Sequence, residues 1–143
     1  MDENQIREEF IKGYDCSQVV ITQYAEKLGL TREQANKVAA CFGGGMLQAD
    51  TCGAFTGALM VIGLKYGHYD EETLLAQKDV MMAKSAEFKK RFFEKFETCN
   101  CKGLLGYDVS IPEEFQEALS SGRMLGFCPT VVKAVCECLD QTL

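Results

Sequence analysis

Apolar side chains recur every three to four residues through most of the chain, which is the spacing of an amphipathic helix. Strand-type alternation is scarce, and there are only two prolines to interrupt helices. The pattern predicts helices over residues 3–12, 16–28, 31–41, 53–66, 70–96, 110–121 and from 128 onward, with one helical turn within 99–105. We therefore expect an all-α fold, a bundle of six to seven helices with short connections, forming one helical cysteine-motif domain over residues 1–143.

Capping residues mark where several of these helices begin and end. Asp15 is a suitable N-cap for the second segment, Gly29 ends it, and Thr31 opens a capping box for the third. The triple glycine Gly43–Gly45 then breaks the helical pattern. On the long fifth segment, apolar side chains at helical spacing predict a core-facing stripe, which consists of Leu74, Met81, Phe88, Phe92 and Phe96.

Charge and composition narrow the classes of function. The formal net charge of -6 argues against nucleic acid as a partner, because nucleic acid binds basic surfaces. The longest apolar stretch, Ala54 to Leu64, is shorter than the about 20 residues of a bilayer span, so no membrane insertion is expected. The polar N-terminus lacks a secretory pattern, which predicts a cytoplasmic protein with reduced thiols. Eight cysteines in that setting indicate metal binding or redox chemistry.

Cys52 carries the strongest chemical signal, because it directly precedes an apolar helical stretch in the run Cys52–Gly57. Unpaired N–H groups and the dipole at a helix N-terminus favour negative charge. The thiolate, not the thiol, is the nucleophile and the metal ligand. Cys16, Cys101 and Cys128 are also predicted to stand at helix starts. Four cysteines in the same local setting suggest one shared site.

A helix N-terminus alone is too weak to activate these thiols. An exposed terminus contributes about 0.3–1 kcal/mol to a nearby charge, which leaves a thiol with a pKa of about 8.5 mostly protonated at neutral pH. A stronger partner is needed, and the only histidine, His68, lies in a turn that favours an exposed position. A coordinated metal is the strongest activator, since it deprotonates a thiol outright.

Glycines near the cysteines have two open interpretations. Gly53 and Gly57 share one helix face, which favours either tight packing of a neighbouring helix or close approach of a ligand. Gly43 and Gly44 belong to the triple glycine, which is either a flexible turn or a nest of N–H groups for an anion such as sulfide or thiolate. The sequence argues against a P-loop, because no strand precedes the glycines and no Gly-Lys-Ser/Thr follows.

The other cysteines carry weaker signals. Cys41 ends an apolar helical face and is expected in the core. Two apart in a helix, Cys136 and Cys138 point to different sides, so we expect Cys136 to be buried or half-buried and Cys138 to be exposed. Cys99 lies two residues before Cys101, and either one fits as the third site cysteine. No Cys-x-x-Cys pair is present.

These residues resemble the C-GCAxxG-C-C family of small redox-active proteins. Cys16 matches the family's early cysteine, the run Cys52–Gly57 matches its central motif, and Cys101 and Cys128 match its two later cysteines. The turn at 42–46 and the helix at 57–64 are also similar to the family, so the resemblance covers about residues 16–135. It implies a redox role, a protein partner such as an oxidoreductase or transporter component, and an iron–sulfur or other metal centre.

Three functions remain open at this point. In the first, an iron–sulfur cluster serves electron transfer or redox sensing and is held by Cys16, Cys52, Cys101 and Cys128. The glycines expected around it are Gly43, Gly44, Gly53 and Gly57. Zinc is the lesser alternative for the same cysteines and would be structural. In the second, two of the same thiols cycle through a disulfide without a cofactor. In the third, the chain is a helical interaction module with core cysteines. The oligomeric state stays open.

Overall fold

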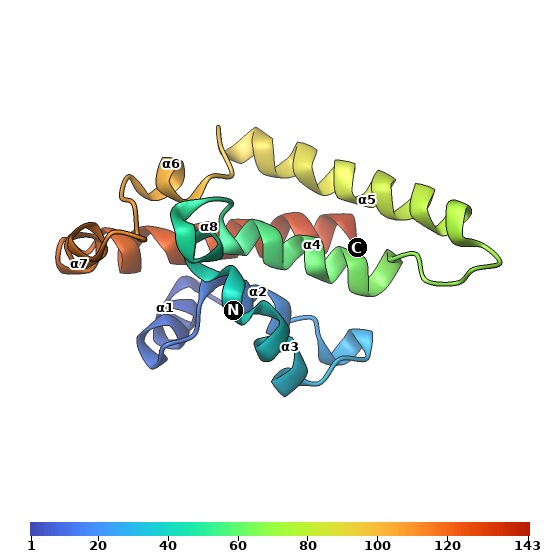
Figure 1. Ribbon diagram of the computed structural model, residues 1–143, viewed down its shortest axis with the longest axis horizontal. Helices are drawn as coiled ribbons and strands as arrows, with labels where there is room; N and C mark the ends of the chain where they lie inside the picture. The colour runs from blue at the N-terminus through green and yellow to red at the C-terminus, as the bar shows by residue number, and fades with distance from the viewer.

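The computed structural model describes residues 1–143, and its regular elements are helical (Figure 1). The α-helices are α1 Glu3–Lys12, α2 Cys16–Thr22, α3 Arg32–Ala39, α4 Gly53–Tyr66, α5 Leu74–Lys95, α6 Cys101–Leu105, α7 Pro112–Ser120 and α8 Arg123–Thr142. Short 3-10 turns at Glu26–Leu28 and Ala40–Phe42 and a π-type turn at Gly45–Ala49 lie in the connections. The predicted all-α fold is confirmed, but eight α-helices form where six to seven were expected.

The additional helix is α6, which the sequence predicted only as a helical turn. Asn100 caps its start, since its side chain accepts a hydrogen bond from the Gly103 N–H at 2.9 Å. Gly106 closes it in the left-handed conformation that glycine adopts without strain. Five residues between two strong caps are therefore enough to form a separate element.

Helices α4 and α8 form the centre of the molecule and pack against each other (Figure 1). Helix α5 covers both on one side, α2 packs on both from another, and α1 packs on α8. At the α4–α5 contact, the Phe55 ring lies 5.6 Å from the Phe88 ring and 5.0 Å from the Phe92 ring, measured between centroids. Helices α6 and α7 lie at the end of the molecule where α8 begins (Figure 1). None of the helices is both long enough and apolar enough to cross a membrane.

The predicted core stripe of α5 is correct only in its C-terminal half. Phe88 and Phe92 are fully buried and Phe96 packs on the core, whereas Met81 is half-buried and the Leu74 side chain is 39% exposed. The reason is visible in Figure 1, where the first turns of α5 extend beyond the C-terminal end of α8 and have no helix there to cover them.

Helix α2 ends at Thr22, six residues before the predicted end at Leu28. Two side chains at its end donate hydrogen bonds to main-chain carbonyls of the last turn. The Thr22 hydroxyl donates to the Gln18 carbonyl at 2.7 Å, and the Gln23 side-chain amide donates to the Val19 carbonyl at 2.9 Å. Such local side-chain bonds compete with helix continuation, and the chain goes on as turns instead.

Helix α8 begins at Arg123, so the predicted start at Cys128 is wrong. The prediction placed Pro129 in the first turn of a helix, where its missing N–H costs nothing. In the structure Pro129 lies inside the helix and leaves the Leu125 carbonyl without its usual donor. Arg7 of α1 fills that role, because its Nε donates to this carbonyl at 2.8 Å. A residue far away in sequence thus allows the helix to run through the proline.

Candidate functional site

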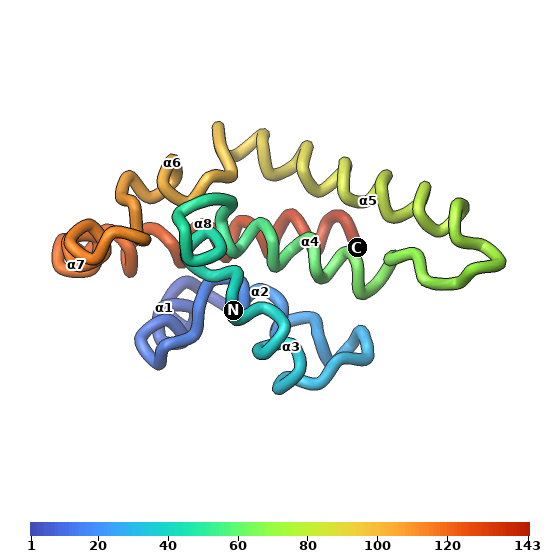
Figure 2. The backbone as a smooth tube through the Cα atoms, in the orientation of Figure 1, coloured from blue at the N-terminus to red at the C-terminus, as the bar shows by residue number.

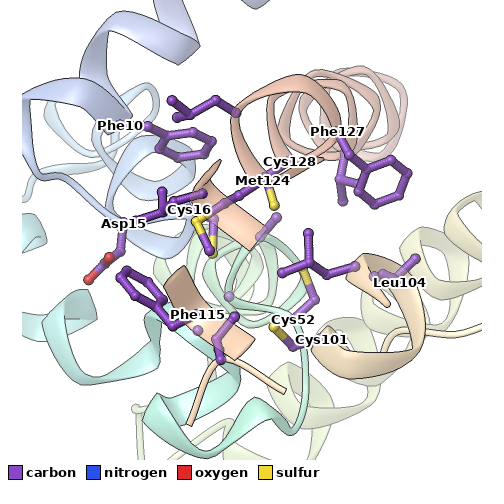
Figure 3. Close-up of a pocket in the computed structure, with 18 of the residues that line it drawn as sticks. Phe10, Asp15, Cys16, Cys52, Cys101, Leu104, Phe115, Met124, Phe127 and Cys128 are labelled. Atoms are coloured by element: carbon purple, nitrogen blue, oxygen red, sulfur yellow. The ribbon is translucent and has the colours of Figure 1, made fainter. Parts of the chain in front are cut away.

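Four cysteines from four parts of the chain line one cavity of about 360 Å³ (Figure 3). Cys16 comes from α2, Cys52 from the residue before α4, Cys101 from α6 and Cys128 from α8. Cys52 is buried and the other three are half-buried, and all four are free thiols. The residues expected to share a site therefore lie on the wall of the same cavity.

Three of these cysteines stand at helix starts as expected, and one does not. Cys16 and Cys101 are the first residues of α2 and α6, and Cys52 is the N-cap of α4. Cys128 lies within α8, because the donor from Arg7 lets that helix begin five residues earlier. Four helix N-termini were expected to point at one cluster, but only three helices begin at the cavity cysteines.

A short antiparallel contact brings the starts of α4 and α6 together. The Cys52 N–H donates to the Cys99 carbonyl at 2.7 Å, and the Cys101 N–H donates to the Asp50 carbonyl at 2.5 Å. Thr51 and Asn100 form the bridge between these two bonds. Cys101 lines the cavity and Cys99 does not, which answers which of the two belongs with the other three.

Cys16 and Cys52 are in direct contact through their side chains. A hydrogen bond with Cys52 is the largest of the causes that raise the pKa of Cys16 well above its usual value, followed by burial. The Gly44 N–H acts in the opposite direction, since it donates to Cys16 and lowers that pKa. The Cys16 and Cys52 side chains therefore interact at the cavity wall.

Cys101 and Cys128 also hold their protons at neutral pH. Burial, with the nearby Cys16 as the second cause, raises the pKa of Cys101 to about 11 and that of Cys128 to about 12. Arg123 lowers the pKa of Cys128 but does not overcome burial. His68 gives no help, because it is exposed at the far end of α4, roughly 20 Å of helix away from Cys52.

Of the four glycines expected around a cofactor, Gly44 and Gly53 line the cavity, and three of the four also make room for neighbouring parts of the protein. A Cβ at position 57 would lie 2.9 Å from the Ser17 carbonyl oxygen, so Gly57 allows α4 to pack closely on α2. A Cβ at position 53 would lie 2.5 Å from the Cys16 sulfur, and one at position 43 would overlap the Asp15 side chain. Close packing therefore accounts for all three positions.

The turn that follows Gly43 is a left-handed helical turn, where the sequence allowed either a flexible turn or a nest of N–H groups. Gly44, Gly45, Met46 and Leu47 have φ angles of 58°, 63°, 61° and 59°. Side chains in this conformation cost about 1–2 kcal/mol per residue, so Met46 and Leu47 are strained. Figure 2 shows the turn curling over the start of α4. It brings the Gly44 N–H to Cys16 and the Asp50 carbonyl to Cys101.

Two predictions for the remaining cysteines are wrong. Cys41 is exposed, because α3 ends at Ala39 and the following 3-10 turn points it away from the core. Cys138 is buried, since it lies at helical spacing from Val135 and Thr142, which are also buried. Cys136 is half-buried as expected, and the Gln23 amide donates to its sulfur at 3.3 Å.

Most residues of the cavity wall were not identified from the sequence, and neither was Arg123 near it. The wall includes Phe10 of α1, Phe115 of α7 and Phe127 of α8, which lie around the thiols (Figure 3). Arg123 donates to the carbonyls of Leu104 and Leu105 and lies 3.9 Å over the Phe127 ring. Apolar positions on α7 and α8 were visible in the sequence, but no motif links them to the cysteines.

The side chains do not fit a bound metal as they are arranged. Four cysteine sulfurs have the right donor chemistry for an iron–sulfur cluster or for zinc. However, no group of three or more Cys, His, Asp or Glu side chains is placed to hold one ion. The thiols surround a cavity, and the direct contact is that between Cys16 and Cys52. The arrangement favours chemistry between two sulfurs.

Comparison with known proteins gives one match. A family model described as "Putative redox-active protein (C_GCAxxG_C_C)" matches residues 14–142. The match spans all four cysteines of the cavity. No curated protein and no solved structure shows a significant match to the chain.

Proposed function

Because the chain belongs to the C-GCAxxG-C-C family of redox-active proteins, we propose that it is a dithiol–disulfide redox protein whose working pair is Cys16 and Cys52. The observation that carries the proposal is the position of the Cys16 sulfur against Gly53 at the start of α4, where the Cys16 side chain interacts with that of Cys52. A disulfide needs Cβ atoms about 3.5–4.5 Å apart, so two thiols already in contact can be linked with little backbone movement. Both also line the cavity, which gives a reactant access to them.

The two sulfurs have different roles in this proposal. Cys16 has the raised pKa and holds its proton toward Cys52, which makes it the hydrogen-bond donor of the pair. Cys52 is the N-cap of α4, a helix of 14 residues whose N-terminus favours a negatively charged sulfur. The helix N-terminus alone is too weak to activate a thiol, so the order of attack follows from Cys16, whose raised pKa keeps its proton in place: Cys52 attacks first, and Cys16 resolves the intermediate.

The exchange reaction balances when the oxidant is a disulfide, such as the oxidised dithiothreitol used in the test below. The Cys52 thiolate attacks one sulfur of the oxidant, forms a mixed disulfide and expels the first thiol. Cys16 then attacks the Cys52 sulfur, closes the Cys16–Cys52 bond and expels the second thiol. One disulfide is consumed and one is formed, and two protons pass from the pair to the products. In the reverse direction a protein oxidoreductase, the proposed partner, would reduce the pair again.

A metal-bound form is the second candidate, and it is supported by the placement of all four cysteines on one cavity wall. It would require the sulfurs to move toward a common point, because they do not converge as they stand. An iron–sulfur cluster would use Cys16, Cys52, Cys101 and Cys128, and zinc would use the same set. This candidate predicts stoichiometric metal in the purified protein, whereas the dithiol proposal requires none.

One preparation tests both candidates. The protein is purified without oxygen, iron, zinc and sulfide are measured, and the thiols are titrated between reduced and oxidised dithiothreitol. We expect a reversible two-electron transition, with the oxidised bond mapped by mass spectrometry to Cys16 and Cys52. Cys52→Ser should abolish the transition, whereas Cys41→Ser should leave it unchanged because Cys41 is exposed outside the cavity. Stoichiometric metal that is lost in Cys128→Ser would overturn the dithiol proposal in favour of the metal-bound form.

A further inference from the structure

The cavity beside the working pair is apolar on almost every side. Of its 20 lining residues, 16 are hydrophobic, the four cysteines included, and they come from α1 and α7 as well as from the elements that carry the thiols. Aromatic rings contribute several of its walls, namely those of Phe10, Phe115 and Phe127 (Figure 3). Tyr14 is a fourth aromatic residue of the lining. A molecule that enters therefore exchanges water for apolar and aromatic contacts, which favours an aromatic ligand.

The apolar wall of the cavity disfavours polar oxidants. Asp15 is the only charged side chain on its wall, and burial raises the pKa of its carboxyl. A polar peptide disulfide such as glutathione disulfide carries net negative charge. It would lose its hydration in an apolar space and would face Asp15 there. An uncharged molecule has neither cost.

The volume limits the size of the ligand. An apolar protein cavity of about 150 Å³ holds one benzene molecule. The cavity of about 360 Å³ described here therefore has room for one substituted ring or a small fused pair of rings. It also falls within the range of about 300–1,000 Å³ that small-molecule sites occupy.

We propose that the oxidant of the Cys16–Cys52 pair is a small uncharged quinone that binds in this cavity. This inference rests on the dithiol function proposed above. A quinone accepts two electrons and two protons, which is what a dithiol releases when it forms a disulfide. The two S–H bonds break, one S–S bond forms, and the two quinone carbonyls become the two hydroxyls of the hydroquinone. No further co-reactant is needed.

Duroquinone is a suitable probe, because methyl groups fill all its ring positions and thiols cannot add to the ring. The reduced full-length protein is mixed with duroquinone without oxygen, and the bond formed is mapped by mass spectrometry. We expect the oxidation rate to saturate with duroquinone concentration. We also expect p-xylene, a similar ring without oxidising groups, to slow the reaction by competition. Glutathione disulfide at equal concentration should react at least about tenfold more slowly, since its transfer into the cavity is unfavourable.

A charge on the cavity wall provides a second test. Phe115→Glu should lower the second-order rate constant for duroquinone at least about tenfold. Phe93→Glu is the matched control, because Phe93 is a similarly exposed phenylalanine on α5 that does not line the cavity. If Phe115→Glu does not fold, p-xylene competition with the unmodified protein still decides.

The outcomes separate this inference from the proposed function. If oxidised dithiothreitol closes the Cys16–Cys52 bond but duroquinone shows neither saturation nor competition, the quinone site is wrong and the dithiol function stands. If no oxidant closes that bond, both proposals fail. If duroquinone saturates, is displaced by p-xylene and yields the mapped disulfide, the quinone site is supported.

Discussion

The Cys16 sulfur lies in the space that a side chain at position 53 would need. A Cβ on residue 53 would be 2.5 Å from this sulfur and 2.8 Å from the Phe42 carbonyl oxygen, both closer than nonbonded atoms approach. Glycine at this position therefore lets Cys16 reach Cys52, the residue directly before it. Gly53 and Cys52 therefore both contribute to the contact between Cys16 and Cys52.

Gly53→Ala should consequently disturb both stability and thiol chemistry. We expect the free energy of unfolding to fall by about 1–3 kcal/mol, as for other overpacked sites, despite the higher helix propensity of alanine. We also expect slower closure of the Cys16–Cys52 disulfide, because the Cys16 side chain must move. Urea unfolding under reducing conditions and timed oxidation by diamide, followed by mass spectrometry, measure the two effects.

Gly63→Ala is the control for that substitution in the same helix. A Cβ at position 63 would meet nothing within 4 Å. The change should therefore raise the free energy of unfolding by up to about 1 kcal/mol through helix propensity alone. Equal effects of Gly53→Ala and Gly63→Ala would show that the Cys16 sulfur does not depend on the glycine.

Gly57→Ala should separate helix packing from the thiol site. Here a Cβ would approach the Ser17 carbonyl oxygen to 2.9 Å, and that acceptor belongs to the backbone of α2. We expect a loss of about 1–3 kcal/mol in the free energy of unfolding, because α2 and α4 must separate slightly. The dithiol redox potential should change less than in Gly53→Ala. A larger change in potential for Gly57→Ala than for Gly53→Ala would contradict this division of roles.

Local signals account for the parts of the fold that the sequence predicted well. Asp2, Asp15 and Thr31 each form a capping box at the start of a helix, and Gly13 and Gly29 adopt the left-handed conformation at helix ends. These signals act within four residues, so a single sequence contains all the information they need.

The errors come from contacts between distant residues. The start of α8 depends on a hydrogen bond from Arg7 to Leu125, and no local pattern around Pro129 contains it. The exposure of Leu74 depends on where α8 ends relative to α5. Cys138 is the exception, because its burial follows from its helical spacing with Val135 and Thr142, which is a local pattern.

The candidate site divides in the same way. Helix starts group Cys16, Cys52 and Cys101, and the family resemblance adds Cys128, which lies inside α8. The apolar cavity was not predictable, because its walls form only where α1, α7 and the first turns of α8 meet. The contact between Cys16 and Cys52 was not predictable either, because it depends on the packing of α2 against α4.

The Cys128 thiol should make stability depend on pH above about 9. Its pKa is about 12 in the folded protein against an ordinary value of 9.0. As pH rises past 9, the unfolded chain loses this proton first, so the free energy of unfolding falls by up to about 1.4 kcal/mol per pH unit from this thiol. Below pH 9 both states keep the proton, and the contribution is constant.

Urea unfolding of the reduced protein between about pH 8 and about pH 10.5 measures this slope. Cys128→Ala should show a shallower fall than the unmodified protein over that range. Cys41→Ala is the matched control, since Cys41 is an exposed cysteine, and it should keep the original slope. Identical slopes for all three proteins would mean that Cys128 ionises equally in the folded and unfolded states.

Arg7 and Pro129 should be energetically coupled through the Leu125 carbonyl. Arg7→Ala leaves this half-buried acceptor without a donor and should lower the free energy of unfolding by about 1–3 kcal/mol. Pro129→Ala restores an N–H within α8 that can donate to the same carbonyl. In that background, Arg7→Ala should therefore cost at least about 1 kcal/mol less.

Asn4→Ala controls for the exposed bond from Arg7 to Asn4 at 2.7 Å and should change stability by less than about 0.5 kcal/mol. A double-mutant cycle by urea unfolding gives the coupling energy directly, and a value near zero would show that α8 tolerates Pro129 without help from α1.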